Sequence, residues 1–329
     1  MCTGTLLSSR VVLTAAHCFT QTDHRDGKSG IPEHKNIGKP IDIFVGLEDY
    51  EEYLDIQKFM RNRRNWQAKY PNVQHFAVKF DPKNNVKLNE NWFHSLEDKK
   101  IKNLPLGDIS LVNLPHEVDL VKTNSIIYPL FAPGYGVSNT GFFPNNVKGL
   151  AAGYGLVNKQ MGRAKQFKQA RMMTKTKNWC QQKTHDLRYG RDVILQDIFC
   201  AEGVTGDSQI CLGDSGGPFF VSDPVSKRLI QMGITVWVDE TCTQEFSGFL
   251  RVNDYINWIE STVWQWNEAV LKFGFERLDA SVRSTKGVKD DRLVQHFGIR
   301  YSNSEQLQKN YSSLEQYSFF SKLLDLFEK

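Results

Sequence analysis

Short apolar runs recur along most of the chain and are separated by Gly, Pro, Asn and Asp at turn-like spacing. After a turn at Ser8–Arg10, the segment Val11–Leu13 has the pattern of an apolar strand, and Ile41–Val45 alternates as a half-buried strand does. Further strand-like runs lie at Val73–Phe80, Asp108–Leu114, Ile126–Leu130, Leu150–Ala152, Asp197–Cys200, Pro218–Val221, Leu229–Val238 and Gly248–Val252. Many short strands with few helices predict an all-β sandwich or barrel.

One segment that follows the strand-like runs has helical periodicity. The apolar residues of Asn253–Val263 fall on one face at helical spacing, which predicts a helix. Residues 264–329 are polar with mixed charge, except for an amphipathic helical pattern in Phe319–Phe327. From Gln21 to about Pro40 the chain is polar with few apolar positions, so we expect a loop.

An acidic cluster at Glu48–Asp55 is followed by a basic cluster at Lys58–Lys69. The two clusters fit a solvated surface element whose opposite charges pair with each other, which is the usual role of such charges. They also fit a patch that docks a substrate. The sequence does not separate these two interpretations.

Composition describes an ordinary soluble protein, since 40% of the 329 residues are hydrophobic and 24% are charged. The net charge of +4 is too small to indicate a nucleic-acid partner. We expect no membrane span, because no apolar run approaches the roughly 18–20 residues that crossing a bilayer requires. The chain begins Met1-Cys2 without the basic start and apolar segment of a secretory signal, which by itself suggests a cytosolic protein.

The six cysteines point the other way if they are bridged. None lies in a CxxC pair typical of zinc or redox sites, and we expect neither a metal ion nor a cofactor. The count alone is equally compatible with scattered buried thiols.

The segment Gly213–Pro218, with the sequence GDSGGP, carries the strongest chemical signal. Glycines around Ser215 favour a tight turn on which backbone N–H groups can converge on a carbonyl oxygen. Serine is a poor nucleophile by itself and needs a base near neutral pKa. His17, which closes the segment LTAAHC, is the candidate base, although an isolated histidine there is more often structural.

Asp108 begins an apolar strand in the segment DISLV, where a buried charge is costly unless it is paired. A carboxylate of this kind can hold the tautomer of a catalytic histidine and stabilise the imidazolium. By itself it could equally cap a turn.

Together, LTAAHC, DISLV and GDSGGP resemble the three signatures of the trypsin-like (chymotrypsin-fold) serine proteases, in the chain order His, Asp, Ser, and the resemblance extends from Cys2 to about Val263. It implies two antiparallel β-barrels with a His17–Asp108–Ser215 triad between them. Ser215 would attack a peptide carbonyl, His17 would transfer the proton, and the N–H groups of Gly213 and Ser215 would hold the oxyanion.

The same resemblance implies the organisation of the chain. Residues 1–125 would form the first barrel, with a long insertion at 20–107, residues 126–263 the second barrel and terminal helix, and residues 264–329 an extension of unknown role. Ile126–Pro133 resembles the crossing between barrels and Gly153–Gly155 the family's Gly-Trp-Gly segment. The implied disulfides are Cys2–Cys18, Cys180–Cys200 and Cys211–Cys242, and three bridges indicate a secreted or extracellular protein.

The start of the chain departs from the family. The strand that precedes CTGTLL in the family is missing, as is the freed N-terminus that pairs with the aspartate matching Asp214. We expect an incomplete N-terminus that has lost a signal peptide. We also expect Asp214 to lack a partner, so that the chain as written is inactive and poorly soluble.

The specificity pocket departs as well. Val236, Trp237 and Val238 replace the family's Ser-Trp-Gly segment, and Gln209 stands at the pocket floor, six residues before Ser215. The opposite wall is Gly248 or Ser247. A pocket without a carboxylate does not favour lysine or arginine, so we expect a small or medium apolar side chain before the scissile bond.

The expected partners are protein or peptide substrates and protease inhibitors. Two other functions remain open. One is a catalytically silent homologue that acts as a binding protein, and the other is a divergent secreted protein that acts mainly through its tail.

Overall fold

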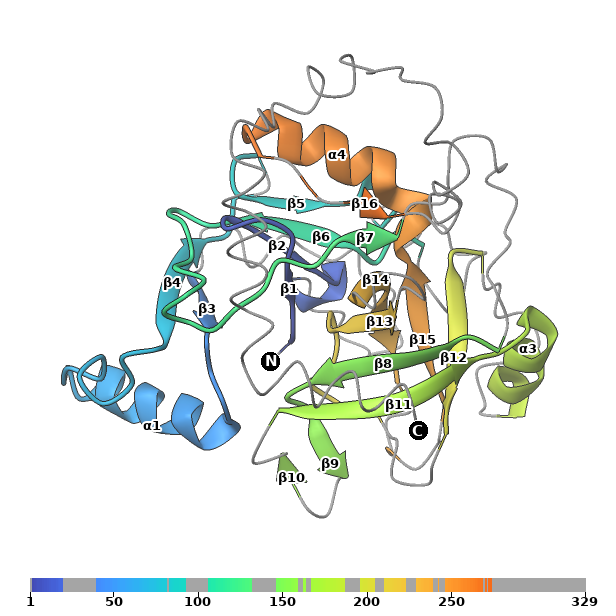
Figure 1. The fold of residues 1–329 in the computed structure, drawn as a ribbon, viewed down its shortest axis with the longest axis horizontal. Helices are drawn as coiled ribbons and strands as arrows, with labels where there is room; N and C mark the ends of the chain where they lie inside the picture. Colours follow the sequence, from blue (N-terminus) through green and yellow to red (C-terminus); the bar gives the residue numbers. More distant parts are fainter. Residues whose placement is uncertain are drawn as a thin grey trace, which may run out of the picture.

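A computed structural model gives a mostly β protein with few helices (Figure 1). The residues that it describes are 2–19, 40–81, 83–92, 106–131, 146–158, 162–163, 167–186, 196–204, 210–222, 229–238, 242, 246–268, 270 and 272–273. The amphipathic pattern at 319–327, the loop after Gln21 and the pocket residue Gln209 lie outside these ranges. Among the described residues, no helix is both long and apolar enough to cross a membrane.

The first β unit consists of two small sheets around one core. A four-stranded sheet has the order β1-β2-β6-β5, and β3 pairs with β4 in a separate antiparallel two-stranded sheet. The bounds are β1 Thr5–Leu6, β2 Val11–Thr14, β3 Pro40–Val45, β4 Gln74–Lys79, β5 Val86–Leu88 and β6 Ser110–Asn113. Val12, Phe76, Val86 and Val112, from four different strands, are buried in a common cluster. The two sheets therefore face each other across an apolar interior, as in a small barrel.

The second β unit is a closed barrel of six antiparallel strands. Its order is β13-β8-β11-β12-β15-β14, and β13 pairs with β14 to close the ring. The bounds are β8 Lys148–Gly153, β11 Lys168–Thr174, β12 Ile198–Gly203, β13 Pro218–Ser222, β14 Leu229–Trp237 and β15 Phe246–Arg251. A short strand, β7 Leu130–Phe131, pairs in parallel with β14, and β16 Lys272–Phe273 pairs in parallel with β7. A separate hairpin joins β9 Leu156–Asn158 to β10 Gly162–Arg163. The predicted all-β fold of paired barrels is confirmed.

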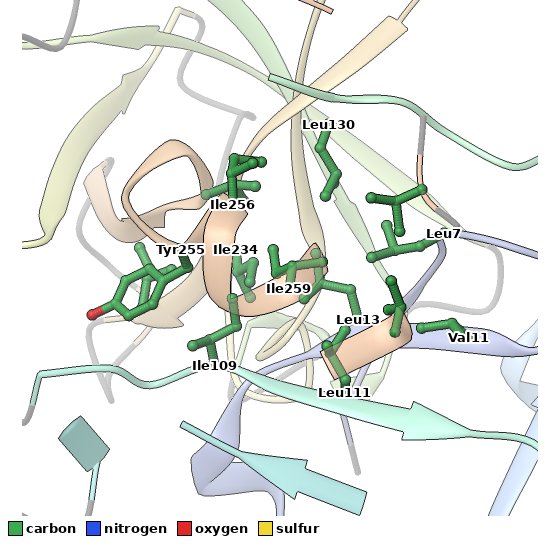
Figure 2. Close-up of a cluster of buried hydrophobic side chains, with 14 of the residues drawn as sticks. Leu7, Val11, Leu13, Ile109, Leu111, Leu130, Ile234, Tyr255, Ile256 and Ile259 are labelled. Atoms are coloured by element: carbon green, nitrogen blue, oxygen red, sulfur yellow. The ribbon is translucent and has the colours of Figure 1, made fainter. Parts of the chain in front are cut away.

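One apolar cluster joins the two β units (Figure 2). Leu13 and Leu111 come from the first unit, Ile234 and Leu250 from the second, and Ile259 from the helix α4, Ile256–Gln265. The predicted helix is confirmed, although its first turn is a 3₁₀ segment, Val252–Tyr255. The helix therefore packs against the apolar cluster that the two β units share.

The helix α1, Tyr50–Arg61, was not predicted as a helix, because its charged clusters hide a modest apolar face. Its N-cap is Asp49, whose carboxylate accepts the N–H of Glu52, and acidic residues in the first turn with basic residues in the last suit the helix dipole. The predicted charge pairing is seen between Lys69 and Asp55, where Lys69 Nζ lies 2.6 Å from Asp55 Oδ2. A third helix, α3 Lys177–Asp186, precedes β12.

Two of the three predicted disulfides are present, Cys2–Cys18 and Cys211–Cys242. The prediction for Cys180 and Cys200 is wrong as a covalent bond in this structure. Both residues are buried thiols, and the pKa of Cys200 is raised well above its ordinary value by the hydrogen bond with Cys180 and then by burial. Cys180 and Cys200 therefore lie next to each other, as the resemblance implies, but they are not joined by a disulfide.

The stability of the protein should depend on the side-chain volume that fills the apolar cluster between the two β units. Ile259 is fully buried in the shared cluster, so Ile259→Ala should lower the free energy of unfolding by about 2–5 kcal/mol, because it removes apolar contacts and leaves a cavity. Trp264→Ala is the control, since this side chain on the same helix is 64% exposed. Equilibrium urea unfolding with the disulfides intact measures both. Equal free energies of unfolding for the two variants would contradict a stabilising role for the packing of Ile259 in the shared cluster.

Candidate active site

His17 and Asp108 meet through two hydrogen bonds. Nδ1 of His17 lies 2.6 Å from Oδ2 of Asp108, and the backbone N–H of His17 donates to Oδ1 at 2.8 Å. His17 stands on a 3₁₀ turn, Ala16–Cys18, directly after β2, and Asp108 lies just before the neighbouring strand β6. The antiparallel pairing of β2 with β6, in which Thr14 lies opposite Ser110, brings the two residues together.

The carboxylate of Asp108 is buried, and the imidazole of His17 pairs with it. Burial by itself lowers the pKa of His17, but the charge and hydrogen bond of Asp108 outweigh it and raise the pKa above 6.5. Because Asp108 holds Nδ1, the other ring nitrogen is the one left for proton transfer.

Ser215 lies on the turn between Cys211 and β13, next to the residues that flank His17. Its carbonyl oxygen accepts the N–H of Thr3 at 2.8 Å and lies 4.0 Å from Sγ of Cys18. That sulfur is within 4.8 Å of a ring nitrogen of His17. The structure contains no hydrogen bond between the side chains of Ser215 and His17, both of which it describes. The fold therefore brings the three predicted triad residues into one region and bonds two of them.

The N–H groups of the turn alternate between bonded and open. Asp214 donates to the carbonyl of Cys211 at 3.1 Å and Gly216 to that of Thr235 at 2.8 Å. Within the described part of the chain, the N–H groups of Gly213 and Ser215 have no acceptor. These are the two donors that the sequence assigned to an oxyanion hole.

The peptide units that carry the open donors are held by their carbonyls. Leu212 O accepts the N–H of Leu156 at 2.9 Å, and Asp214 O accepts that of Gly217 at 2.8 Å. Since a peptide unit is planar, fixing its C=O also fixes the direction of its N–H. The open donors are thus set in place before any ligand arrives.

Glycine is required in this turn for two reasons. Gly213 and Gly216 have φ values of 102° and 78°, which favour glycine. A Cβ on Gly216 would also lie 2.0 Å from Oγ1 of Thr14 on β2. The close approach of the Ser215 turn to the first β unit depends on the missing side chain.

Asp214 has partners, contrary to the expectation from the sequence. Its carboxylate accepts the N–H of Gly155 at 2.7 Å and the N–H of Cys211 at 3.0 Å. A Cβ on Gly153 or Gly155 would lie 2.1 Å or 2.4 Å from its carboxylate oxygens, which explains the two glycines around Tyr154. The expectation that this chain leaves Asp214 without a partner is therefore wrong.

The predicted pocket residues lie on two paired strands. Trp237 on β14 is directly opposite Gly248 on β15, and a Cβ on Gly248 would come within 3.2 Å of the Trp237 Cβ. The register shifts between Thr235 and Trp237, so Val236 falls at an irregularity of the strand. Val236 and Val238 are half-buried.

Sequence reasoning missed Asp197, a buried residue just before β12. Its Oδ2 accepts the N–H of Gly107 at 2.8 Å and the hydroxyl of Tyr255 at 2.5 Å. Gly107 directly precedes Asp108, so a carboxylate of the second β unit fixes the backbone next to Asp108. Burial raises the pKa of Asp197. No pattern in the sequence marks this contact, because it joins two loops 90 residues apart.

One group of metal-ligand atoms lies near the site, but it does not fit a metal ion. A ring nitrogen of His17 and the sulfurs of Cys2 and Cys18 lie within 4.8 Å of one another. The two sulfurs are joined in a disulfide and so cannot act as thiolates. Nδ1 of His17 is occupied by Asp108.

The chain resembles serine proteases over most of its length. The family model described as Trypsin matches residues 1–259. Clotting factor G beta subunit of Tachypleus tridentatus is 23% identical over 79% of this chain and 70% of its own length. Complement C1r subcomponent-like protein of Rattus norvegicus is 24% identical and venom serine protease 34 of Apis mellifera 25% identical, each over 79% of this chain. The matches span only 46% and 51% of those two proteins.

Two solved structures share the fold, each covering 80% of this chain with a TM-score of 0.51. One is a mutant of human heparin binding protein (CAP37), which is 18% identical and matched over 85% of its chain. The other is neuropsin, a serine protease expressed in the limbic system of mouse brain, which is 19% identical and matched over 88%.

The pairing of His17 with Asp108 should be visible in the titration of the ring. The pKa of His17 should lie above 6.5, and Asp108→Asn should lower it, because the charge that stabilises the imidazolium is removed while burial remains. Since folding raises this pKa, the pair stabilises the fold fully below about pH 6.5, and this contribution is lost as the pH rises through the folded-state pKa. NMR titration of the His17 ring protons tests the assignment, with His116, an exposed residue, as the internal control. An unchanged His17 pKa in Asp108→Asn would contradict it.

Proposed function

Because the chain belongs to the trypsin family of serine proteases, we propose that it is a serine endopeptidase that cleaves peptide bonds through an acyl-enzyme. Ser215 is the nucleophile, His17 the general base and Asp108 the carboxylate that orients it. The observation that carries the proposal is the bonded His17–Asp108 pair beside a turn with two open N–H donors.

The proposed reaction proceeds in two halves. Nε2 of His17 takes the proton of Ser215 while Oγ attacks the peptide carbonyl, and the resulting oxyanion is held by the N–H groups of Gly213 and Ser215. The protonated His17 then gives its proton to the leaving amine, which leaves the acyl group on Ser215. Water, activated by the same histidine, completes the hydrolysis.

The second candidate is a catalytically silent homologue that acts as a binding protein. The missing hydrogen bond between Ser215 and His17 favours it. In apo structures, however, such bonds are often long or unformed and tighten only with substrate. The presence of all three triad residues favours the enzyme.

We further propose that the protein is secreted and acts on protein or peptide substrates, with protease inhibitors as possible partners in regulation. The disulfides Cys2–Cys18 and Cys211–Cys242 support an oxidising compartment. No role for nucleic acid is proposed, because the net charge is only +4.

A fluorophosphonate probe distinguishes the two candidates. The inactivity expected from the sequence rested on an Asp214 without partners, and this carboxylate accepts two backbone N–H groups. We therefore predict that the purified protein is labelled at Ser215. Ser215→Ala should abolish labelling without changing the unfolding midpoint, because the side chain is small and its turn is held by backbone bonds. Ser110→Ala serves as the control for loss of a buried hydroxyl that bonds the carbonyl of Ala15 instead. A folded protein that takes no label would support the silent homologue.

Substrate preference should follow the pocket. We predict a small or medium apolar side chain before the scissile bond, because Val238 narrows the entrance and Gln209 offers no charge. A peptide library read by mass spectrometry measures it, with Val238→Gly as the variant expected to admit larger side chains. A clear preference for arginine or lysine would contradict this proposal.

A further inference from the structure

Thr3 connects the first β unit to the nucleophile turn. It is half-buried and follows Cys2 of the first disulfide. Its hydroxyl donates to the carbonyl of Gly213 at 3.2 Å, and its backbone N–H donates to the carbonyl of Ser215 at 2.8 Å. Its own carbonyl accepts the hydroxyl of Thr14 at 2.7 Å. A single residue thus holds two carbonyls of the turn and is itself anchored to β2.

The two carbonyls belong to alternate peptide units. The unit Gly213–Asp214 is held at its C=O by Oγ1 of Thr3 and at its N–H by Cys211. The unit Ser215–Gly216 is held at its C=O by the N–H of Thr3 and at its N–H by Thr235. Each plane is therefore fixed at both ends, and the open N–H of Ser215 lies on the unit between them.

The hydroxyl is the contact that matters most for Gly213. A glycine has the widest choice of backbone conformations, so its peptide planes rotate easily unless hydrogen bonds hold them. The backbone N–H of Thr3 remains whatever side chain stands there. The hydroxyl is the part of the clamp that this particular residue supplies.

We propose that Thr3 is a positioning residue for the oxyanion hole. Its hydroxyl fixes the Gly213–Asp214 peptide unit, so that the open N–H groups of Gly213 and Ser215 point to the same place. The residue touches no reacting atom and acts through the turn. This inference deepens the proposed function and rests on it for its catalytic consequence.

Three variants test the hydroxyl. Thr3→Val keeps the shape and removes the donor, Thr3→Ser keeps the donor, and Thr3→Ala covers the case in which the valine variant does not fold. Thr5→Val is the matched control, because Thr5 is a buried threonine on the following strand whose hydroxyl has no partner among the described residues. All four are compared with the unmodified chain.

The first readout is labelling by a fluorophosphonate, resolved into its binding constant and its maximal rate. Thr3→Val should lower the maximal rate about five- to tenfold, the worth of one hydrogen bond, with the binding constant unchanged. Thr3→Ser should restore the rate, and Thr5→Val should match the unmodified chain. An unchanged rate in Thr3→Val, or no rescue by serine, would overturn the proposal.

The second readout needs no activity. Hydrogen–deuterium exchange of the peptide covering residues 211–217 should be faster in Thr3→Val and normal in Thr3→Ser and Thr5→Val. If the unmodified chain takes no label, the proposed protease function fails, and the exchange measurement alone decides whether Thr3 holds the turn. Unchanged exchange in Thr3→Val would overturn the clamp itself.

Discussion

The two β units share one buried apolar cluster, and the contacts between the candidate catalytic residues depend on it. Leu13 and Leu111 flank the segments of His17 and Asp108, while Ile234 precedes the strand segment that binds the turn of Ser215. Burying a side chain of this size contributes about 1.5–3 kcal/mol. Because protein interiors are close-packed, neither unit can shift without disturbing the other. The helix α4 adds Ile259 to the same cluster and so contacts both β units.

A second constraint is the cost of a buried charge. Asp108 is 5% exposed, and an ionised carboxylate in such a place is stable only when it is paired and hydrogen-bonded. Among the described residues, both hydrogen bonds to this carboxylate come from His17, so the same contact pairs the buried charge and orients the imidazole. Asp197 supports the arrangement from the other β unit through the N–H of Gly107.

In the turn that carries Ser215, backbone hydrogen bonds fix the orientation of a site that has few side chains. Glycines allow the chain to approach β2 and the Asp214 carboxylate, but they also leave it free to rotate. Four consecutive peptide units are held by hydrogen bonds, and the N–H groups of Gly213 and Ser215 have no acceptor among the described residues. The partners include Thr3 and Leu156, which belong to different β units. A preorganised donor pair is the arrangement that stabilises charge developing in a transition state.

The sequence by itself determined the local features, because these depend on neighbours along the chain. Short apolar runs predicted most strands, helical spacing predicted α4, and the segments around His17, Asp108 and Ser215 predicted that these residues would lie in one region. The resemblance implied three cysteine pairs, and two of them are disulfides in the structure.

Other features were decided by the tertiary structure. The sequence missed the helix α1, whose charged surface hides its apolar face, and it left Asp214 without the backbone donors that it has. It also missed Asp197 and Thr3, whose partners lie 90 and 210 residues away along the chain. A threonine or an aspartate has no recognisable pattern when its role is a hydrogen bond across two folded units. Such a bond exists only after the strands have paired and the shared core has brought the units together.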